Sequence, residues 1–160
     1  MTYEETVSYL FNCAPPFQQV GNTGYKEGLT TTIKFDNHLG NPHKKFPTIH
    51  IAGTNGKGSV ATFISSVMAA NDMKVGVFTS PYLERFTERI RILDGKTGLM
   101  DFIADDSTGE ISQADLDKYS GMVKKAREKM VSEGLCDEPT EFELITAICF
   151  LYFADMKVDV

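Results

Sequence analysis

The sequence predicts an α/β domain with a mostly parallel sheet flanked by helices, and three observations support this prediction. Residues 48–52 form a short apolar run that is followed by a glycine-rich turn. From Ser59 onward, apolar residues recur at helical spacing, and a second apolar run at 75–78 follows directly. A strand, a helix and a strand within about 30 residues form a βαβ unit. Because such units cross over with parallel strands, we expect both runs in one parallel sheet.

The composition is that of an ordinary globular protein. The 160 residues are 42% hydrophobic, and 16 basic against 22 acidic residues give a net charge of −6. This acidic balance argues against a dedicated nucleic-acid binder, and no apolar run approaches the roughly 20 residues that a membrane helix needs. The N-terminus is acidic where a signal peptide is basic, and three widely spaced cysteines indicate reduced thiols. We therefore expect a cytoplasmic, monomeric protein.

Further elements are expected on both sides of the βαβ unit. The predicted helices cover residues 2–14, 29–39, 112–134 and 140–154, and further strands are predicted over 89–93 and from 157 onward. Capping boxes at Thr2 and Thr140 open two of the helices. Gly40 and Gly134 close two others, because a helix commonly ends on a glycine in the left-handed conformation.

The segment Gly53-Thr54-Asn55-Gly56-Lys57-Gly58-Ser59 lies between the first strand and its helix, where α/β sheets bind ligands. Its glycines allow backbone N–H groups to form a concave nest for phosphate, and the helix N-terminus adds N–H groups and a positive dipole end. Lys57 can supply charge to phosphate oxygens, and Ser59 can supply a hydroxyl to Mg²⁺. The strict P-loop spacing is not met, because Ile51 replaces its first glycine and Gly58 follows the lysine. The alternative is a plain glycine-rich turn.

With Ile51-Ala52 before it, this loop resembles the ATP loop of the Mur ligase superfamily and, more closely, that of the folylpolyglutamate synthase/dihydrofolate synthase family. Four further stretches match that family in order: Tyr25–Leu29, Leu39–Pro42, Thr79–Leu83 leading into Phe86–Ile90, and Thr140–Glu143. The resemblance spans essentially the whole chain. It implies that residues 1–160 are an N-terminal P-loop-type ATPase domain of the Mur ligase kind, incomplete at its C-terminus and without a C-terminal domain.

The resemblance also implies an ATP-dependent amide ligase of folate biosynthesis. In that family, ATP phosphorylates a carboxylate of dihydropteroate or a folate, and the amine of L-glutamate then attacks the acyl phosphate. The expected cofactors are ATP and Mg²⁺, and the expected partners are these small-molecule substrates. Two alternatives stay open. The chain acts as an isolated nucleotide-binding fragment without ligase activity, or it belongs to a cell-wall Mur ligase.

Individual residues receive expected roles. Lys57 is the expected catalytic residue, because it can neutralise the charge of the transferring phosphoryl group. The residues expected to hold ATP are Thr54, Asn55, Gly56, Lys57, Gly58 and Ser59. By resemblance to the family, Ser80 is a metal ligand, together with Ser59. Also by resemblance, the substrate contacts are Lys26, Glu27, Gly28, Thr140, Glu141, Phe142 and Glu143.

Several of these residues have a structural alternative. Ser59 has the alternative of a helix N-cap, Ser80 that of a strand-terminating turn, and Phe142 that of a core residue. Tyr82 stands where the family commonly has a histidine. Glu88 and Arg89 are expected to form a surface pair, with an active-site role as the alternative.

Overall fold

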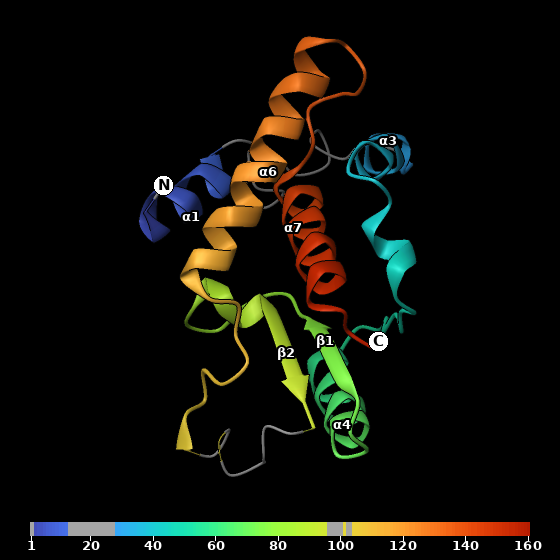
Figure 1. Ribbon diagram of the computed structural model, residues 1–160, viewed down its shortest axis with the longest axis vertical. Coiled ribbons are helices and arrows are strands. Elements are labelled where there is room, and N and C mark those ends of the chain that lie inside the picture. Colours follow the sequence, from blue (N-terminus) through green and yellow to red (C-terminus); the bar gives the residue numbers. More distant parts are fainter. Residues whose placement is uncertain (1, 13–27, 96–100, 102–103) are drawn as a thin grey trace. The chain divides into compact units, whose positions relative to one another are not determined.

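The structure is a computed structural model that describes residues 2–12, 28–95, 101 and 104–160 (Figure 1). The chain divides into two compact units. The first contains residues up to Pro42 together with Gln113–Tyr152, and the second contains His43–Ser112 together with Phe153–Val160. The single domain expected over residues 1–160 therefore stays a prediction, and the units are described separately below.

The first unit is helical. Its elements are α1 (Tyr3–Asn12), α3 (Thr30–His38), α6 (Gln113–Ser132) and the greater part of α7 (Glu141–Met156). Both α1 and α3 pack against α6, which buries a stripe of residues at helical spacing that includes Leu116, Tyr119 and Val123. The predicted positions of these four helices are confirmed. The box at the start of α1 is also confirmed, because the Thr2 N–H donates to Glu5 and the Glu5 N–H donates back to the Thr2 hydroxyl.

The second unit contains the glycine-rich loop and both strands of the described residues. Helix α4 (Lys57–Ala69) is followed by β1 (Lys74–Phe78), and the short 3₁₀ helix η3 (Phe86–Arg89) leads into β2 (Ile90–Asp94). β1 and β2 pair antiparallel, from Lys74 opposite Asp94 to Phe78 opposite Ile90. Both strands lie where the apolar and alternating patterns predict them.

The expected parallel pairing between residues 48–52 and 75–78 is not observed. Residues 48–52 form no strand, and no neighbouring segment within the described residues supplies the ladder of hydrogen bonds that a strand needs. The terminal residues instead reach the edge of β1, where Asp159 donates to the Lys74 carbonyl and Gly76 donates to the Val160 carbonyl. These two bonds advance in the same direction along both segments, as in parallel pairing. A mostly parallel sheet otherwise stays a prediction.

Helix α4 is buried on one side only. It contacts β1 and β2, yet Val60, Phe63 and Val67 form an exposed apolar stripe in which Phe63 is 72% exposed. Ser65 is the one buried residue of this helix. The apolar periodicity that predicts α4 therefore does not predict the packing of its apolar side chains. Among the described residues, no helix is long and apolar enough to cross a bilayer.

Candidate phosphate-binding site

Chain geometry brings two of the predicted site segments to one end of the second unit. Helix α4 and strand β1 are joined by only four residues, so they run in opposite directions, as Figure 1 shows. The 13 residues of α4 extend about 20 Å, and the five of β1 extend about 17 Å. Helix α4 ends and β1 begins at this connection. The loop that precedes α4 and the turn that follows β1 therefore lie at similar distances from it.

The loop before α4 has the backbone of an anion-binding nest. Gly56 is the N-cap of the helix with φ = 75°, in the left-handed region that favours glycine, and no side chain caps the helix start. Within the described part of the chain, the N–H groups of residues 54–59 donate to no acceptor. A Cβ atom added at Gly56 or Gly58 would meet no atom within 4 Å. The nest is thus accessible to a ligand.

Lys57 curls back over this loop. Its Nζ donates to the carbonyl of Gly53 at 2.7 Å and to that of Thr54 at 3.3 Å. A cation at a helix N-terminus is disfavoured by the helix dipole, and the two carbonyls compensate for this. The ammonium is therefore held against the same loop that carries the N–H groups.

Ser59 lies in the first turn of α4 and is exposed. The alternative that Ser59 caps the helix is wrong, because the helix begins two residues earlier and its N-cap is Gly56. Gly56 adopts the left-handed conformation at the N-cap, so the helix starts upstream of Ser59 and without a side-chain cap. The Ser59 hydroxyl consequently has no role in capping.

The turn after β1 carries Ser80, which is exposed. Its Oγ accepts a hydrogen bond from Nη2 of Arg89 at 3.1 Å. Arg89 itself is only 7% exposed, and its guanidinium carbon lies 5.8 Å from the ring centroid of Tyr82 and 5.6 Å from that of Phe86. The expected surface pair of Glu88 and Arg89 is wrong, because the Arg89 side chain packs inward.

Glu88 closes the turn in a different way. Its carboxylate accepts the backbone N–H groups of Leu83, Glu84 and Arg85 at 2.8, 3.0 and 2.7 Å. These hydrogen bonds, with that of Leu83 the strongest cause, lower the pKa of Glu88 from its ordinary value. The carboxylate thereby fixes the segment that follows Ser80.

A cluster around Glu110 was not predicted from the sequence. The Glu110 side chain is 6% exposed and accepts hydrogen bonds from Arg85 at 2.9 Å, from Arg91 at 3.0 Å and from the Thr87 hydroxyl. The partners come from positions 19 to 25 residues away, so no local spacing could have indicated them. The cluster ties residue 110 to the start of β2.

The substrate residues predicted by resemblance fall in the first unit or outside the description. The box of Thr140 and Glu143 is confirmed, because the Thr140 N–H donates to Glu143 at 2.8 Å and the Glu143 N–H donates to the Thr140 hydroxyl at 3.3 Å. The Thr32 hydroxyl donates to the other oxygen of Glu143. Phe142 is 51% exposed, so the alternative of a core residue is wrong. Glu141 begins α7 and is half-buried.

Of the predicted substrate loop, Lys26 and Glu27 lie outside the described residues. Gly28 is described, with φ = 81° in an exposed bend. Gly28 is therefore the one residue of this predicted contact that the structure describes. The contacts of this loop with a substrate stay a prediction.

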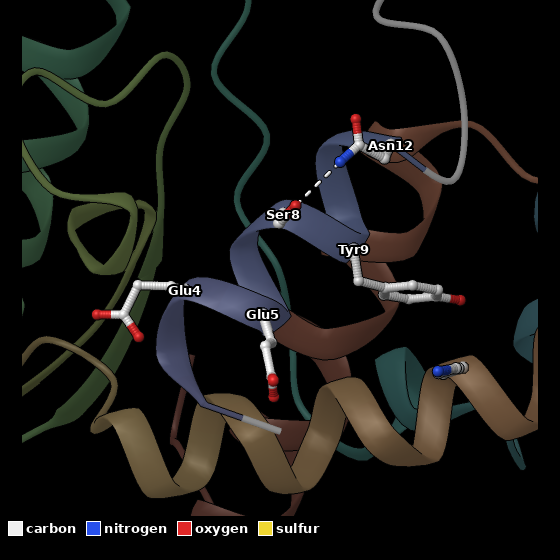
Figure 2. A pocket seen from close by; sticks show the side chains of 6 residues that line it. Glu4, Glu5, Ser8, Tyr9 and Asn12 are labelled. Carbon is white, nitrogen blue, oxygen red and sulfur yellow. Dashed lines mark hydrogen bonds between the residues drawn. The ribbon is translucent and has the colours of Figure 1, made fainter.

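A hollow of about 520 Å³ lies elsewhere, beside α1 (Figure 2). Its lining consists of Glu4, Glu5, Ser8, Tyr9, Asn12 and Lys124. None of the predicted site residues contributes to it. Among the residues that the structure describes, no cluster of three or more His, Cys, Asp or Glu side chains could hold a metal ion.

Comparisons with known proteins find relatives over the whole length of this chain. The chain is 35% identical over 160 residues to the folylpolyglutamate synthase of Lacticaseibacillus casei and 38% identical over 138 residues to the dihydrofolate synthase/folylpolyglutamate synthase of Bacillus subtilis (strain 168). These matches cover 100% and 85% of this chain, but 32% and 28% of the relatives. The chain thus spans about a third of the length of the relatives it matches, or less.

The fold is also similar to that of solved structures. An FPGS–AMPPCP–folate complex superposes with a TM-score of 0.80 at 34% identity, covering 100% of this chain and 34% of that one. No protein-family model matches the chain. The resemblance found in the sequence motifs is therefore confirmed across the whole chain, and the fold is that of part of a Mur-ligase-type synthase.

Proposed function

This chain is homologous over its full length to part of the folylpolyglutamate and dihydrofolate synthases. From that premise we propose that it provides the ATP site of an ATP-dependent ligase. The ligase adds L-glutamate to dihydropteroate or to a reduced folate in folate biosynthesis. One observation carries the proposal. The open N–H nest of residues 54–59, with the Lys57 ammonium folded over it, can bind the phosphates of a nucleoside triphosphate.

In the proposed reaction, the bond between the γ-phosphorus and its bridging oxygen breaks, and a substrate carboxylate oxygen bonds to that phosphorus. ADP leaves, and the amine of L-glutamate attacks the acyl carbon. The amine loses a proton, phosphate departs, and an amide forms. Phosphoryl transfer asks the protein for positioning and charge neutralisation, so no protein nucleophile is required. Lys57 supplies the charge, and the backbone of Thr54, Asn55, Gly56 and Gly58 orients the phosphates.

The described residues fit a magnesium ion that arrives with the nucleotide. The candidate ligands Ser59 and Ser80 are neutral hydroxyls, and Mg²⁺ commonly combines few protein ligands with phosphate oxygens and water. The hydroxyl of Ser80 retains a lone pair beyond the one that Arg89 occupies. When bound, the ion would neutralise phosphate charge. Ser59 and Ser80 would each direct one oxygen toward it.

The proposed substrate contacts come from the first unit. The exposed ring of Phe142 offers a flat apolar face of the kind on which a pterin stacks, and Thr140, Glu141 and Glu143 provide polar groups beside it. Lys26, Glu27 and Gly28 are proposed as a second contact on the resemblance alone. We further propose that the protein is a monomer in the cytoplasm.

A second candidate function is nucleotide binding without ligation. Two observations favour it. The chain covers only 32% of the Lacticaseibacillus casei relative, and the apolar stripe of Val60, Phe63 and Val67 on α4 is exposed. In this candidate function, the loop of residues 54–59 binds ATP and no phosphoryl transfer follows.

The deciding experiment incubates the protein with ATP, Mg²⁺, L-glutamate and either dihydropteroate or tetrahydrofolate, and measures phosphate release. A ligase releases phosphate only when both the pterin substrate and glutamate are present. ATP binding without release supports the second candidate. Phosphate release that ignores both substrates contradicts ligation.

A matched pair of lysine variants tests the loop itself. Lys57→Ala is expected to weaken ATP binding at least about 100-fold, since several charge-assisted interactions with phosphate are lost. Lys125→Ala removes an exposed lysine of α6 and is expected to leave ATP affinity within about twofold. Equal affinities of the two variants would contradict the proposed nucleotide site.

A further inference from the structure

The pairing of β1 and β2 continues beyond the two strands and brings Ser80 next to Arg89. The Thr79 N–H donates to the Arg89 carbonyl at 3.0 Å, one step past the pair of Phe78 and Ile90. This backbone bond holds residue 89 level with residue 79. The Arg89 side chain can then reach the neighbouring Ser80, whose Oγ lies 3.1 Å from Nη2.

The guanidinium of Arg89 is fixed by its surroundings. The side chain is buried, and the rings of Tyr82 and Phe86 lie within 5.8 Å of its central carbon and meet edge to face at 6.0 Å. Aromatic faces attract a cation and compensate in part for its removal from water. A buried, planar, permanently charged donor offers far fewer orientations than an exposed side chain.

This arrangement limits the rotation of Ser80. An exposed serine hydroxyl normally samples several rotamers, whereas the Oγ of Ser80 accepts a charge-assisted hydrogen bond from a fixed donor. One lone pair is thereby occupied. The O–H and the second lone pair are not used by Arg89, and Ser80 is exposed.

We propose that Arg89 is a positioning residue of the nucleotide site and acts through Ser80. Being buried, it does not touch the ligand; it holds the Ser80 oxygen in the orientation that meets a magnesium–nucleotide complex. The inference rests on the proposed function, in which Ser80 is a magnesium ligand. It adds a residue that no local motif spacing assigns to the site.

The test is a double-mutant cycle on ATP affinity, measured by calorimetric titration with Mg²⁺ and again with EDTA. Arg89→Met and Ser80→Ala are each expected to reduce the magnesium-dependent gain in affinity about tenfold, as loss of a hydrogen bond to a charged group implies. Affinity in EDTA is expected to change less than about twofold. The double variant is expected to lose no more than either single variant, because both substitutions break one interaction.

Two controls keep the result interpretable. Arg91→Met removes an arginine of β2 that bonds Glu110 rather than Ser80, and is expected to leave the magnesium-dependent gain unchanged. Arg89→Lys keeps the buried charge without the planar fork, and is expected to fold and to retain part of the gain. A second cycle on urea midpoints without nucleotide should show a combined shift smaller than the sum of the single shifts.

The outcomes separate the two proposals. If the unsubstituted protein binds no ATP, the proposed function fails, and the role of Arg89 fails with it. If it binds ATP but the losses of Arg89→Met and Ser80→Ala add, or appear equally in EDTA, the positioning role alone is overturned.

Discussion

Two turns of the second unit present consecutive backbone N–H groups, and they differ in what those groups meet. At Leu83–Arg85, three N–H groups donate to the carboxylate of Glu88. At residues 54–59, the N–H groups meet no acceptor among the described residues, and Lys57 supplies a cation instead. Both are concave arrangements of the same kind of donor.

The difference teaches that a nest is a binding site only when the chain does not fill it. An acidic residue three to five positions away closes the first turn and makes it a rigid support. The glycine-rich loop has no acidic residue in that reach, since residues 49–64 contain neither Asp nor Glu. A cation beside open N–H groups leaves a place for an external anion.

After Lys57→Ala, the largest effect is expected from adding a methyl group inside the open nest. Gly58→Ala meets no atom within 4 Å, so the fold has room for it, and alanine favours a helix over glycine by about 1 kcal/mol. A phosphate held by the same backbone leaves no such room. We therefore expect unchanged or slightly increased stability together with ATP affinity at least about tenfold weaker.

Gly121→Ala is the matched control for that variant. Gly121 lies in α6, also with no atom within 4 Å of an added Cβ atom. It should raise the free energy of unfolding by a similar amount and leave ATP affinity unchanged. Equal ATP affinity of the Gly58 and Gly121 variants would mean that no ligand approaches the loop closely.

A smaller effect is expected from strain in the loop. Gly56 has φ = 75°, where a residue with a Cβ atom costs roughly 1–2 kcal/mol. Gly56→Ala should therefore lower the free energy of unfolding of the second unit by about that amount, measured by urea denaturation. Gly56→Asn should lose less, because asparagine tolerates this region better. Equal losses for both variants would contradict the left-handed conformation.

The smallest effect concerns the filled turn and depends on pH. Because folding lowers the pKa of Glu88 from 4.5, its carboxylate contributes stability above that value. This contribution is lost as the pH falls through the lowered folded-state pKa. Urea midpoints measured downward from about pH 5 should fall less steeply in Glu88→Gln than in the unsubstituted protein. Glu84→Gln, which alters an exposed carboxylate, is the control. If its urea midpoint fell with pH as gradually as that of Glu88→Gln, the closed turn would be contradicted.

Much of the fold followed from local pattern. Apolar spacing located the helices and the two strands, and the boxes at Thr2 and Thr140 form the hydrogen bonds that their spacing predicts. The loop of residues 53–59 could be predicted as a phosphate site because glycines, lysine and helix start are contiguous. Ser80 could be singled out only by resemblance, since a Thr-Ser-Pro turn has no chemistry of its own.

The remainder depended on partners far away in the sequence. Arg89 and Glu88 are adjacent, yet one packs inward against aromatic rings and the other binds the backbone of its own turn. The side chains that donate hydrogen bonds to Glu110 lie about 20 residues away in the sequence. The apolar stripe of α4 has the periodicity of a buried face but is exposed.

By itself, the sequence determined which segments are helical and singled out one loop as a candidate phosphate site, because these properties arise within a few residues. Tertiary structure decided the direction of strand pairing, the burial of Arg89 and its hydrogen bond to Ser80. Those properties arise from segments that meet in space, where burial and geometry select among side-chain arrangements that local spacing leaves equivalent.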